Sequence, residues 1–424
     1  MKLTESQKFA LDYMLTGDNI FLTGRAGTGK TELIKEFIKQ SNKNVILCAP
    51  TGIAAINIGG ETLHHVFKIP VRPLSEHERL KNPTSVISLA DVIIIDEISM
   101  VRPDIFVYVS NTLLKLKRQP QLIVVGDFYQ LPPVLSDRDK ETLMGLWGFD
   151  TPDKVPTFAF QTFSWRLWNF KPIVLEEVVR QDNELYIGLL NFLRVGDKRV
   201  LQYFNHYCNT PLEPDAIYLC GLNKIANQRN EEKLAELSTE EHIFTGHVIG
   251  DMGKGEKPAP ETLKLKVGAK VMSLINGEDT STSKRFQNGS LGEVIEIQDK
   301  YIKVKFNSLE APVLVGKYQW DNIEYSVDVD ANGNKHLSQT IIGSYTQFPL
   351  RLAYAITIHK SQGQTFDNIN LDPFTFSHGQ LYVALSRGRD LSKIHLTKLI
   401  KDEFLIVDNA VNDYYKFVDL LKVN

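Results

Sequence analysis

Cysteine is scarce in this chain, and its placement argues against two common ways of stabilising a fold. The 424 residues include three cysteines, Cys48, Cys208 and Cys220, and no two of them have the C-x-x-C spacing of a metal site. Neither a zinc site nor a framework of disulfides is therefore indicated. We expect all three to be buried, reduced thiols.

Long apolar runs are also lacking. No segment has the roughly 20 consecutive apolar residues that a membrane-spanning helix needs. Residues 1–12 carry charges where a secretory signal peptide would have its apolar core. We therefore expect no membrane partner and an intracellular location, in the cytoplasm or, in a prokaryote, in the nucleoid.

The chain has no overall excess of positive charge. Its formal net charge of −3 argues against a protein that coats nucleic acid by bulk attraction. Residues 341–401 nevertheless hold seven basic and three acidic residues, so a local basic groove and an ordinary solvated face both remain open. The content of 43% hydrophobic and 23% charged residues is that of a folded soluble protein, and the length suggests about two to four domains.

A glycine-rich motif is the most informative feature that is present. Residues 24–31 read GRAGTGKT and match G-x-x-x-x-G-K-[ST] in full, between an apolar run and a helix-forming stretch. Such a loop aims backbone N–H groups and a helix dipole at a polyphosphate, while Lys30 adds a charge and Thr31 a hydroxyl for Mg²⁺. A nucleoside triphosphatase is predicted. The residues expected at the phosphates are Gly24, Gly27, Thr28, Gly29, Lys30 and Thr31.

Two more polar signatures follow apolar runs. VIII at 92–95 is followed by Asp96 and Glu97, and QLIVV at 121–125 is followed within five residues by Gln130. In P-loop ATPases an acidic residue at a strand tip holds Mg²⁺ and a neighbouring carboxylate polarises the attacking water. Asp96 suits the first role and Glu97 the second, although an acidic pair is also a common device at helix N-termini. The amide of Gln130 can sense the γ-phosphate or orient water.

The pattern of apolar runs predicts an α/β fold with an inserted β module. Continuous apolarity marks strands covered on both faces, at residues 19–22, 44–49, 91–95 and 121–126. The stretch LGEVIEIQDKYIKVKF at 291–306 alternates strictly around a break at 298–300, which is a hairpin signal. Strand-like runs at 217–220, 369–371 and 394–397 flank that region, so a second α/β domain is expected to surround a small all-β module.

The order of the motifs resembles that of superfamily 1 helicases, in particular the PIF (petite integration frequency) and RecD-like branch. The strings are GRAGTGKT, APTGIAA, TLHHVF, DEISM, GDFYQLPPV, LEEVVRQ, ITIHKSQGQT and LYVALSRGR. The resemblance extends from Gln7 to Arg389. The resemblance implies two RecA-like P-loop lobes that bind ATP with Mg²⁺. It also implies 5′-to-3′ translocation on single-stranded DNA and unwinding of forked duplex DNA by a monomer.

The same resemblance assigns roles around the nucleotide. It implies that Gln7 recognises adenine and that Gly363 lies near the nucleotide. Arg180 and Arg387 would be arginine fingers that stabilise the charge developing on the transferred phosphoryl group. Arg351 and Arg389 are rivals for that role, and a structural ion pair is the alternative for each of them.

Nucleic-acid contacts are implied on another face. The residues bordering the single strand would be Pro50, Thr51, Thr62 and His64 in the first lobe, and Thr357, His359, Lys360 and Ser361 in the second. Small hydroxyls and a lysine suit phosphate contacts that position a strand without reading its sequence. Phe67 and Phe128 could stack on bases, but core packing is the more common role of an aromatic residue. We expect Trp165 and Trp168 to pack within the lobe.

The resemblance also implies domain boundaries. Residues 1–170 would form the first lobe, with a short strand-separating wedge at 68–90. Residues 171–262 and 344–424 would form the second lobe, and 263–343 the inserted Src-homology-3-like module. A basic edge of that module would comprise Lys264, Lys266, Lys270, Lys284 and Arg285.

Competing interpretations remain at this stage. A P-loop GTPase or kinase is disfavoured because the chain lacks an N-K-x-D base reader. A nucleic-acid-stimulated ATPase that acts as a clamp and displaces bound proteins stays open. The motifs do not decide between DNA and RNA, or between the PIF and RecD-like branches.

Overall fold

The computed structural model describes residues 3–177, 183–252, 257–278, 285–286, 288–329 and 335–421. The chain divides into two compact units. Unit 1 comprises residues 1–180, 322–342 and 408–424, and unit 2 comprises residues 181–321 and 343–407. Within the described residues, no helix combines the length and apolarity that crossing a membrane would require.

Unit 1 is built on a six-stranded sheet with the order β3-β2-β4-β5-β1-β6. Every pairing in it is parallel, as the continuously apolar runs predicted. The strands are β1 (Ile20–Gly24), β2 (Val45–Ala49), β3 (Glu61–Thr62), β4 (Val92–Ile95), β5 (Gln121–Val125) and β6 (Lys171–Leu175). The patterns at 19–22, 44–49, 91–95 and 121–126 predicted four of these strands, whereas β3 and β6 were not predicted.

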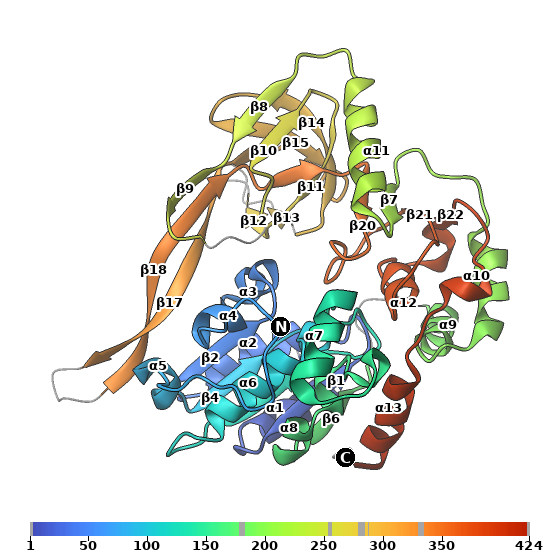
Figure 1. Cartoon of the computed structure of the whole chain (residues 1–424). Coiled ribbons are helices and arrows are strands. Elements are labelled where there is room, and N and C mark those ends of the chain that lie inside the picture. The colour runs from blue at the N-terminus through green and yellow to red at the C-terminus, as the bar shows by residue number, and fades with distance from the viewer. Residues whose placement is uncertain are drawn as a thin grey trace. The chain divides into compact units, whose positions relative to one another are not determined.

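Alternating residues of each strand face opposite sides of this sheet. On one side, helices α1 (Glu5–Met14) and α2 (Lys30–Gln40) pack through Leu11 and Phe37 on Leu22 and Ile94. On the other side, Phe21 contacts an aromatic cluster that includes Trp165. The remaining helices of unit 1 are α3 (Gly52–Ile58), α4 (Leu63–Val66), α5 (Ser85–Leu89), α6 (Pro103–Leu113), α7 (Asp137–Trp147), α8 (Phe163–Leu167) and α13 (Asn409–Leu421) (Figure 1).

The C-terminal helix α13 packs against unit 1. The Tyr414 ring stacks on Phe160 with centroids 4.2 Å apart, and the Trp165 indole N–H donates to the Tyr414 hydroxyl at 3.0 Å. Burial raises the pKa of the Tyr414 hydroxyl. Residues 408–424 were expected in the second lobe with 344–407, and the contacts group them with unit 1 instead.

Unit 2 contains a second parallel sheet with the order β20-β7-β21-β22. Its strands are β7 (Ile217–Cys220), β20 (Ala355–Thr357), β21 (Ile369–Leu371) and β22 (Ile394–Leu396), and all three pairings are parallel. The accompanying helices are α9 (Glu184–Arg194), α10 (Leu201–Cys208), α11 (Asn223–Ala235) and α12 (Gln380–Leu385). The three strand-like runs that flank the β-rich region are thereby confirmed as neighbours in one sheet.

The inserted β module has its own core. A five-stranded antiparallel sheet with the order β16-β15-β14-β11-β19 joins β11 (Lys270–Ser273), β14 (Leu291–Ile297), β15 (Tyr301–Phe306), β16 (Val313–Gly316) and β19 (Leu350–Leu352). The predicted hairpin is β14 and β15, with a bulge between Val294 and Glu296. Shorter or flanking strands are β8 (His242–Thr245), β9 (His247–Gly250), β10 (Thr262–Leu265), β12 (Gly277–Glu278), β13 (Arg285–Phe286), β17 (Tyr318–Val329) and β18 (Lys335–Gln347).

All three cysteines are buried, reduced thiols, as expected. Burial raises the pKa of Cys208 to about 12 and that of Cys220 to about 11. These thiols therefore stay protonated at neutral pH and act as small apolar groups.

Candidate functional site

The glycine-rich loop forms the turn between β1 and α2. Gly27 and Gly29 have φ of +84° and +79°, in the left-handed region that glycine adopts without steric cost. A Cβ at Gly24 would lie 2.7 Å from the Leu175 carbonyl oxygen, so a side chain there would collide with β6. The loop leads directly into the N-terminus of α2, whose unpaired N–H groups and dipole favour an anion.

The Lys30 side chain folds back over this loop. Its ammonium donates to the carbonyl oxygens of Gly24 at 2.8 Å and Arg25 at 3.1 Å. The Thr28 hydroxyl also donates to Arg25, at 3.0 Å. Thr31 follows in the first turn of α2. The loop is thus organised by its own lysine, in a position from which the charge can turn to a phosphate.

Gln7 supports the loop from helix α1. Its Nε2 donates to the Thr28 carbonyl at 3.0 Å, and its Oε1 accepts the Thr4 N–H at 3.0 Å as part of a capping box. A Cβ at Gly29 would lie 2.5 Å from that Nε2, so the amide rests directly on the loop. Adenine recognition by Gln7 stays a prediction, and the observed contacts add a role in bracing the loop.

Asp96 and Glu97 lie at the end of β4. Asp96 is 6% exposed, and burial first and the Glu97 charge second raise its pKa from the ordinary range. The Glu97 N–H, which donates to Asp96 at 2.8 Å, and the Lys30 charge act in the opposite direction. Glu97 itself adopts φ of +52°, a strained conformation for a non-glycine residue that places two carboxylates at one point.

This carboxylate pair fits a divalent cation. Oxygen ligands are those that Mg²⁺ prefers, and Asp96 together with the Thr31 hydroxyl provides them at the edge that carries Lys30. A cation there would also favour the ionised form of Asp96, whose pKa burial and the Glu97 charge raise. Asp96 and Thr31 would hold the cation, and it would shield the charge of the phosphates.

The turn after β5 brings Gln130 to the same edge. Gly126 donates its N–H to the Leu22 carbonyl of β1 at 3.1 Å, and Gln130 donates its N–H to the Asp127 carbonyl at 2.9 Å. Asp127 and Gln130 are 1% and 7% exposed. Because β4, β5 and β1 are consecutive neighbours in a parallel sheet, their carboxyl ends bring Asp96, Gln130 and the P-loop together.

Arg387 occupies the interior of unit 2. It is 1% exposed, and its guanidinium donates to the carbonyls of Val383 at 2.8 Å and Gln364 at 3.2 Å and to the Ser386 hydroxyl at 2.7 Å. It thereby ties α12 to the turn that contains Gly363, which has φ of +78°. A role as arginine finger stays a prediction. Arg180, the other predicted finger, lies outside the described residues.

The predicted strand-facing residues of unit 1 lie at the ends of β2 and β3. Thr51 is exposed and accepts the Ala54 N–H at 3.2 Å, next to half-buried Pro50. Thr62 caps α4 by accepting the His65 N–H at 3.2 Å. Burial and the charge of Arg102 lower the pKa of His64, so its imidazole is neutral at neutral pH and acts as a hydrogen-bonding group.

Their counterparts in unit 2 differ in accessibility. His359 and Lys360 are half-buried, whereas Thr357 is 3% and Ser361 0% exposed. The Ser361 hydroxyl donates to the Ile358 carbonyl at 2.7 Å, and burial lowers the pKa of His359. Thr357 and Lys360 line a cavity of about 560 Å³ that is also lined by residues of α11 and β10, including Lys264.

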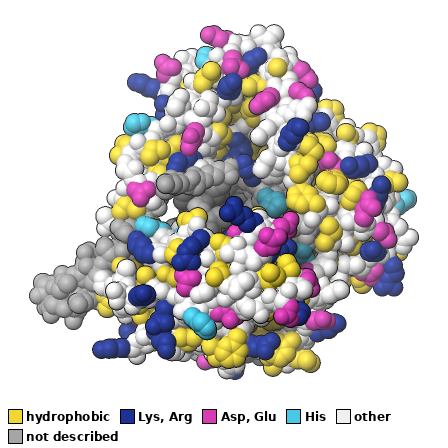
Figure 2. All heavy atoms as spheres, in the orientation of Figure 1, with side chains coloured by type: hydrophobic (Ala, Val, Ile, Leu, Met, Phe, Trp, Pro, Cys, Tyr) yellow, Lys and Arg dark blue, Asp and Glu magenta, His cyan; other side chains and the backbone are white. Residues whose placement is uncertain are grey.

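The residues of the predicted basic edge of the β module differ in their contacts. Lys266 donates to the Leu237 carbonyl at 2.8 Å, and Lys270 is paired with Asp215 at 2.5 Å. Lys264 is exposed on β10. Lys284 and the side chain of Arg285 lie outside the described part of the chain. Over the face drawn in Figure 2, basic and acidic side chains are interspersed.

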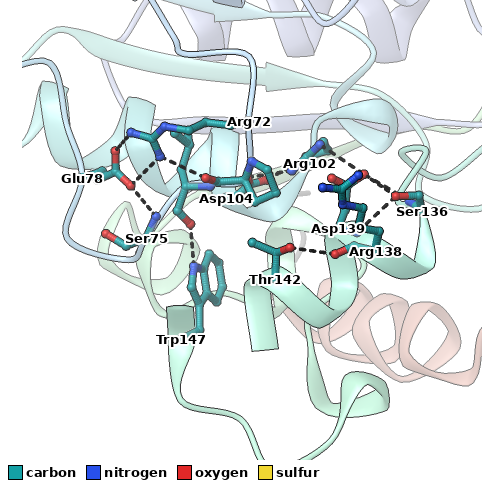
Figure 3. A network of polar contacts seen from close by, with 12 residues as sticks. Arg72, Ser75, Glu78, Arg102, Asp104, Ser136, Arg138, Asp139, Thr142 and Trp147 are labelled. Atoms are coloured by element: carbon teal, nitrogen blue, oxygen red, sulfur yellow. Dashed lines mark hydrogen bonds and ion pairs between the residues drawn. The ribbon is translucent and has the colours of Figure 1, made fainter. Parts of the chain in front are cut away.

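Residues 68–90, the predicted wedge, are held against α6 and α7 (Figure 3). Arg72 pairs with Glu78 at 2.7 Å, and Glu78 also accepts the Ser75 N–H at 2.7 Å. The Leu74 N–H donates to Asp104 of α6 at 3.1 Å, and the Trp147 indole donates to the Leu74 carbonyl at 2.8 Å. The neighbouring Val71 is 95% exposed. The segment is thus anchored and exposes one apolar side chain.

The four aromatic residues considered in the sequence analysis fall in the core. Phe67 and Phe128 are both 0% exposed, so the packing interpretation is confirmed and base stacking by them is not supported. Trp165 and Trp168 are 5% and 3% exposed and pack within unit 1, as expected. Residues that the motifs did not indicate are Tyr414 and Tyr415 of α13, whose spacing with other apolar residues of that helix signals burial but not a partner.

A parallel sheet that presents a P-loop lysine, a strand-end carboxylate pair and a glutamine at one edge defines a P-loop nucleoside triphosphatase. A second parallel sheet and an inserted β module complete the architecture of a motor ATPase with two RecA-like lobes.

Comparisons with known proteins identify the group. The PIF1-like helicase family matches residues 2–185, and the UvrD-like helicase C-terminal domain matches residues 352–393. The ATP-dependent DNA helicase Pif1 of Campylobacter jejuni is 34% identical over 97% of this chain and 98% of its own length. The crystal structure of Bacteroides sp Pif1 in complex with ADP-AlF4 matches with a TM-score of 0.87 at 34% identity, over 99% of this chain and 98% of that one. Bacteroides Pif1 bound to single-stranded DNA matches with a TM-score of 0.68 at 35% identity, over 98% and 97% of the two chains. The chain belongs to the PIF1-like helicase family and is an ATP-hydrolysing enzyme.

Proposed function

We propose that this protein is an ATP-dependent DNA helicase that translocates 5′-to-3′ on single-stranded DNA and unwinds forked duplex. The observation that carries the proposal is the convergence of Lys30, Asp96 and Gln130 at one sheet edge in a chain of the PIF1-like helicase family. The presence of two parallel sheets, each with its own signature motifs, supports coupling of ATP hydrolysis to movement along a nucleic-acid strand.

For hydrolysis we propose the following roles. The P-loop N–H groups and Lys30 bind the β- and γ-phosphates, and Thr31 and Asp96 hold Mg²⁺. Glu97, which directly follows Asp96 and has a strained backbone, polarises the attacking water. Gln130 orients that water or senses the γ-phosphate. Arg387 and Arg180 stabilise the charge that develops on the phosphoryl group.

For the strand we propose two sets of contacts, one on each unit. Pro50, Thr51, Thr62 and His64 belong to unit 1, and Thr357, His359, Lys360 and Ser361 to unit 2. Lys360 and Lys264 line one cavity of unit 2, which supports a path for phosphates there. The buried Ser361 acts through the backbone of its turn, because its hydroxyl already donates to Ile358. We further propose that the anchored loop 68–90 separates strands with its exposed Val71 tip.

Direction of movement is the decisive test. Matched duplexes with only a 5′ or only a 3′ single-stranded tail are compared in Mg²⁺ and ATP, with strand separation followed by fluorescence. We expect opening of the 5′-tailed duplex and none of the 3′-tailed one. Preference for the 3′ tail would overturn the polarity. ATP turnover stimulated by single strands without opening of either duplex would favour a clamp that displaces bound proteins.

The acting unit is proposed to be a monomer. Light scattering of the protein with and without a forked substrate gives the mass of the complex, and a mass of two protein copies per fork would contradict the proposal.

A further inference from the structure

The C-terminal helix places one phenol at the back of the ATPase site. Tyr415 of α13 is 7% exposed and lies in unit 1 beside the ends of two neighbouring strands. Its ring stacks on Tyr129 with centroids 4.7 Å apart and planes 25° apart. Tyr415 is therefore held in one orientation, with its hydroxyl directed at the start of the P-loop and at the turn after β5.

The hydroxyl makes three hydrogen bonds. It lies 2.7 Å from the Thr23 hydroxyl, accepts the Phe128 N–H at 3.2 Å and donates to Asp127 Oδ1 at 3.2 Å. A phenol has one proton and the Asp127 carboxylate, when ionised, only accepts, so the Thr23 hydroxyl must be the donor toward Tyr415. Every hydrogen-bonding position of this phenol is used.

These partners belong to the two catalytic segments. Thr23 is the residue before Gly24, the first glycine of the P-loop, and it is 0% exposed. Asp127 Oδ1 also accepts the Tyr129 N–H at 3.2 Å, and the Asp127 carbonyl accepts the Gln130 N–H at 2.9 Å. The phenol thus joins the end of β1 to the turn that positions Gln130.

We propose that Tyr415 is a positioning residue for ATP hydrolysis, acting through the turn 126–130 on Gln130. The turn carries several buried polar groups, and a rigid turn keeps the Gln130 amide in reach of the γ-phosphate and water. The proposal rests on the role given to Gln130 above. It adds that the last helix of the chain, far from every motif in sequence, is a working part of the ATPase lobe.

Tyr415→Phe removes the hydroxyl and keeps the stacked ring. We expect kcat of single-strand-stimulated ATP hydrolysis to fall about fivefold to tenfold, because the turn loses its hydrogen bonds to the hydroxyl, while KM for ATP changes less than about twofold. Tyr414→Phe is the matched control, because it keeps the ring that packs on Phe128 and removes only the neighbouring hydroxyl, which accepts from Trp165. It should lower the melting temperature, because a buried hydrogen bond is lost, and leave kcat unchanged.

Thr23→Val and the double variant test the connection. If both hydroxyls act through one cluster, the double variant should lose no more kcat than the single variant with the larger loss. Independent roles would instead multiply the two losses. Wild-type kcat for Tyr415→Phe, or an equal loss for Tyr414→Phe, would overturn the proposal. Gln130→Ala distinguishes a failure of the role given to Gln130 from a failure of the role given to Tyr415. Unchanged kcat there would refute the role of Gln130, and a large loss there with a silent Tyr415→Phe would refute only that of Tyr415.

Discussion

At the scale of single residues, the role of a charged side chain depends on which groups its charge contacts. Lys30 is the clearest case, since its ammonium donates to two carbonyls of its own loop, and its charge partly opposes the rise that burial and Glu97 cause in the pKa of Asp96. Arg387 is a contrasting case. Its guanidinium is buried among carbonyls of unit 2, so any part it plays in hydrolysis is combined with holding the turn at Gly363.

Lys30→Ala should lower ATP turnover by at least about 10²-fold, because no other cation can replace its charge on the β- and γ-phosphates. Binding of single-stranded DNA, measured by fluorescence anisotropy without nucleotide, should stay within about twofold, since the proposed strand contacts use other residues. Lys35→Ala on the same helix removes an exposed lysine paired with Glu32 and is the control. If the Lys30 variant lost ATP turnover and DNA binding to the same extent, the proposal of separate sites for ATP and DNA would be wrong.

Glu78 provides a test by pH. Its hydrogen bond with Arg72, followed by that with Ser75, lowers its pKa from 4.5 to about 2. A depressed pKa in the folded state adds stability above the unfolded value of about 4.5 and loses it as the pH falls toward 2. The melting temperature of Glu78→Gln should therefore lie below that of the wild type at pH 7, and the gap should close between about pH 4.5 and 2.

Glu76→Gln is the matched control for that experiment, because Glu76 is an exposed carboxylate of the same loop. Its melting temperature should follow the wild type at every pH. A gap for Glu78→Gln that is equally wide at pH 7 and at pH 3 would show that the carboxylate acts by packing and not by charge.

At the level of elements, adjacency of strands and anchoring of loops decide what each segment can do. Strand β6 borders β1 along five paired residues, and its Leu175 carbonyl is the reason that position 24 admits only glycine. The loop 68–90 has little regular structure, yet bonds from α6 and α7 hold it in place. The inserted β module carries its basic residues on separate strands, with different partners.

Two lysines of that module, exposed Lys264 and paired Lys270, should contribute differently to the salt dependence of DNA binding. Lys264→Ala should reduce the slope of log K against log salt for single-stranded DNA by about 0.7, the value for one phosphate contact. Lys270→Ala should leave the slope unchanged, because Asp215 already neutralises that ammonium. Binding isotherms at several salt concentrations measure both. Equal slopes for the wild type and the Lys264 variant would remove β10 from the strand path.

At the scale of the whole molecule, the chain order and the spatial units do not coincide. Residues 408–424 leave unit 2 and complete unit 1, and residues 322–342 of the long β17–β18 segment also group with unit 1. A truncation that removes α13 would therefore damage the lobe that holds the P-loop, although it deletes the end of the chain. The net charge of −3, together with the interspersed charges on the face drawn in Figure 2, agrees with local phosphate contacts and not with a single basic field.

Much of the nucleotide site was readable from the sequence, because its chemistry depends on residues close together in the chain. GRAGTGKT, the pair Asp96-Glu97 and the hairpin at 291–306 each specify local geometry, and the structure places them as predicted. The family followed from the order of such motifs. Strand β6 was missed although KPIVL is mostly apolar, because its second residue is a proline, which argues against a strand.

The tertiary structure alone decided which distant residues meet. Periodicity in α13 indicated a buried face, but only packing shows that Tyr415 reaches Thr23 and Asp127, some 290 to 390 residues away in sequence. Likewise, a sequence cannot tell that the Gln7 amide lies on the P-loop or that the Ser361 hydroxyl is taken by its own turn. Motifs specify chemistry through local spacing, whereas hydrogen bonds between remote segments depend on how strands and helices pack, which no short pattern encodes.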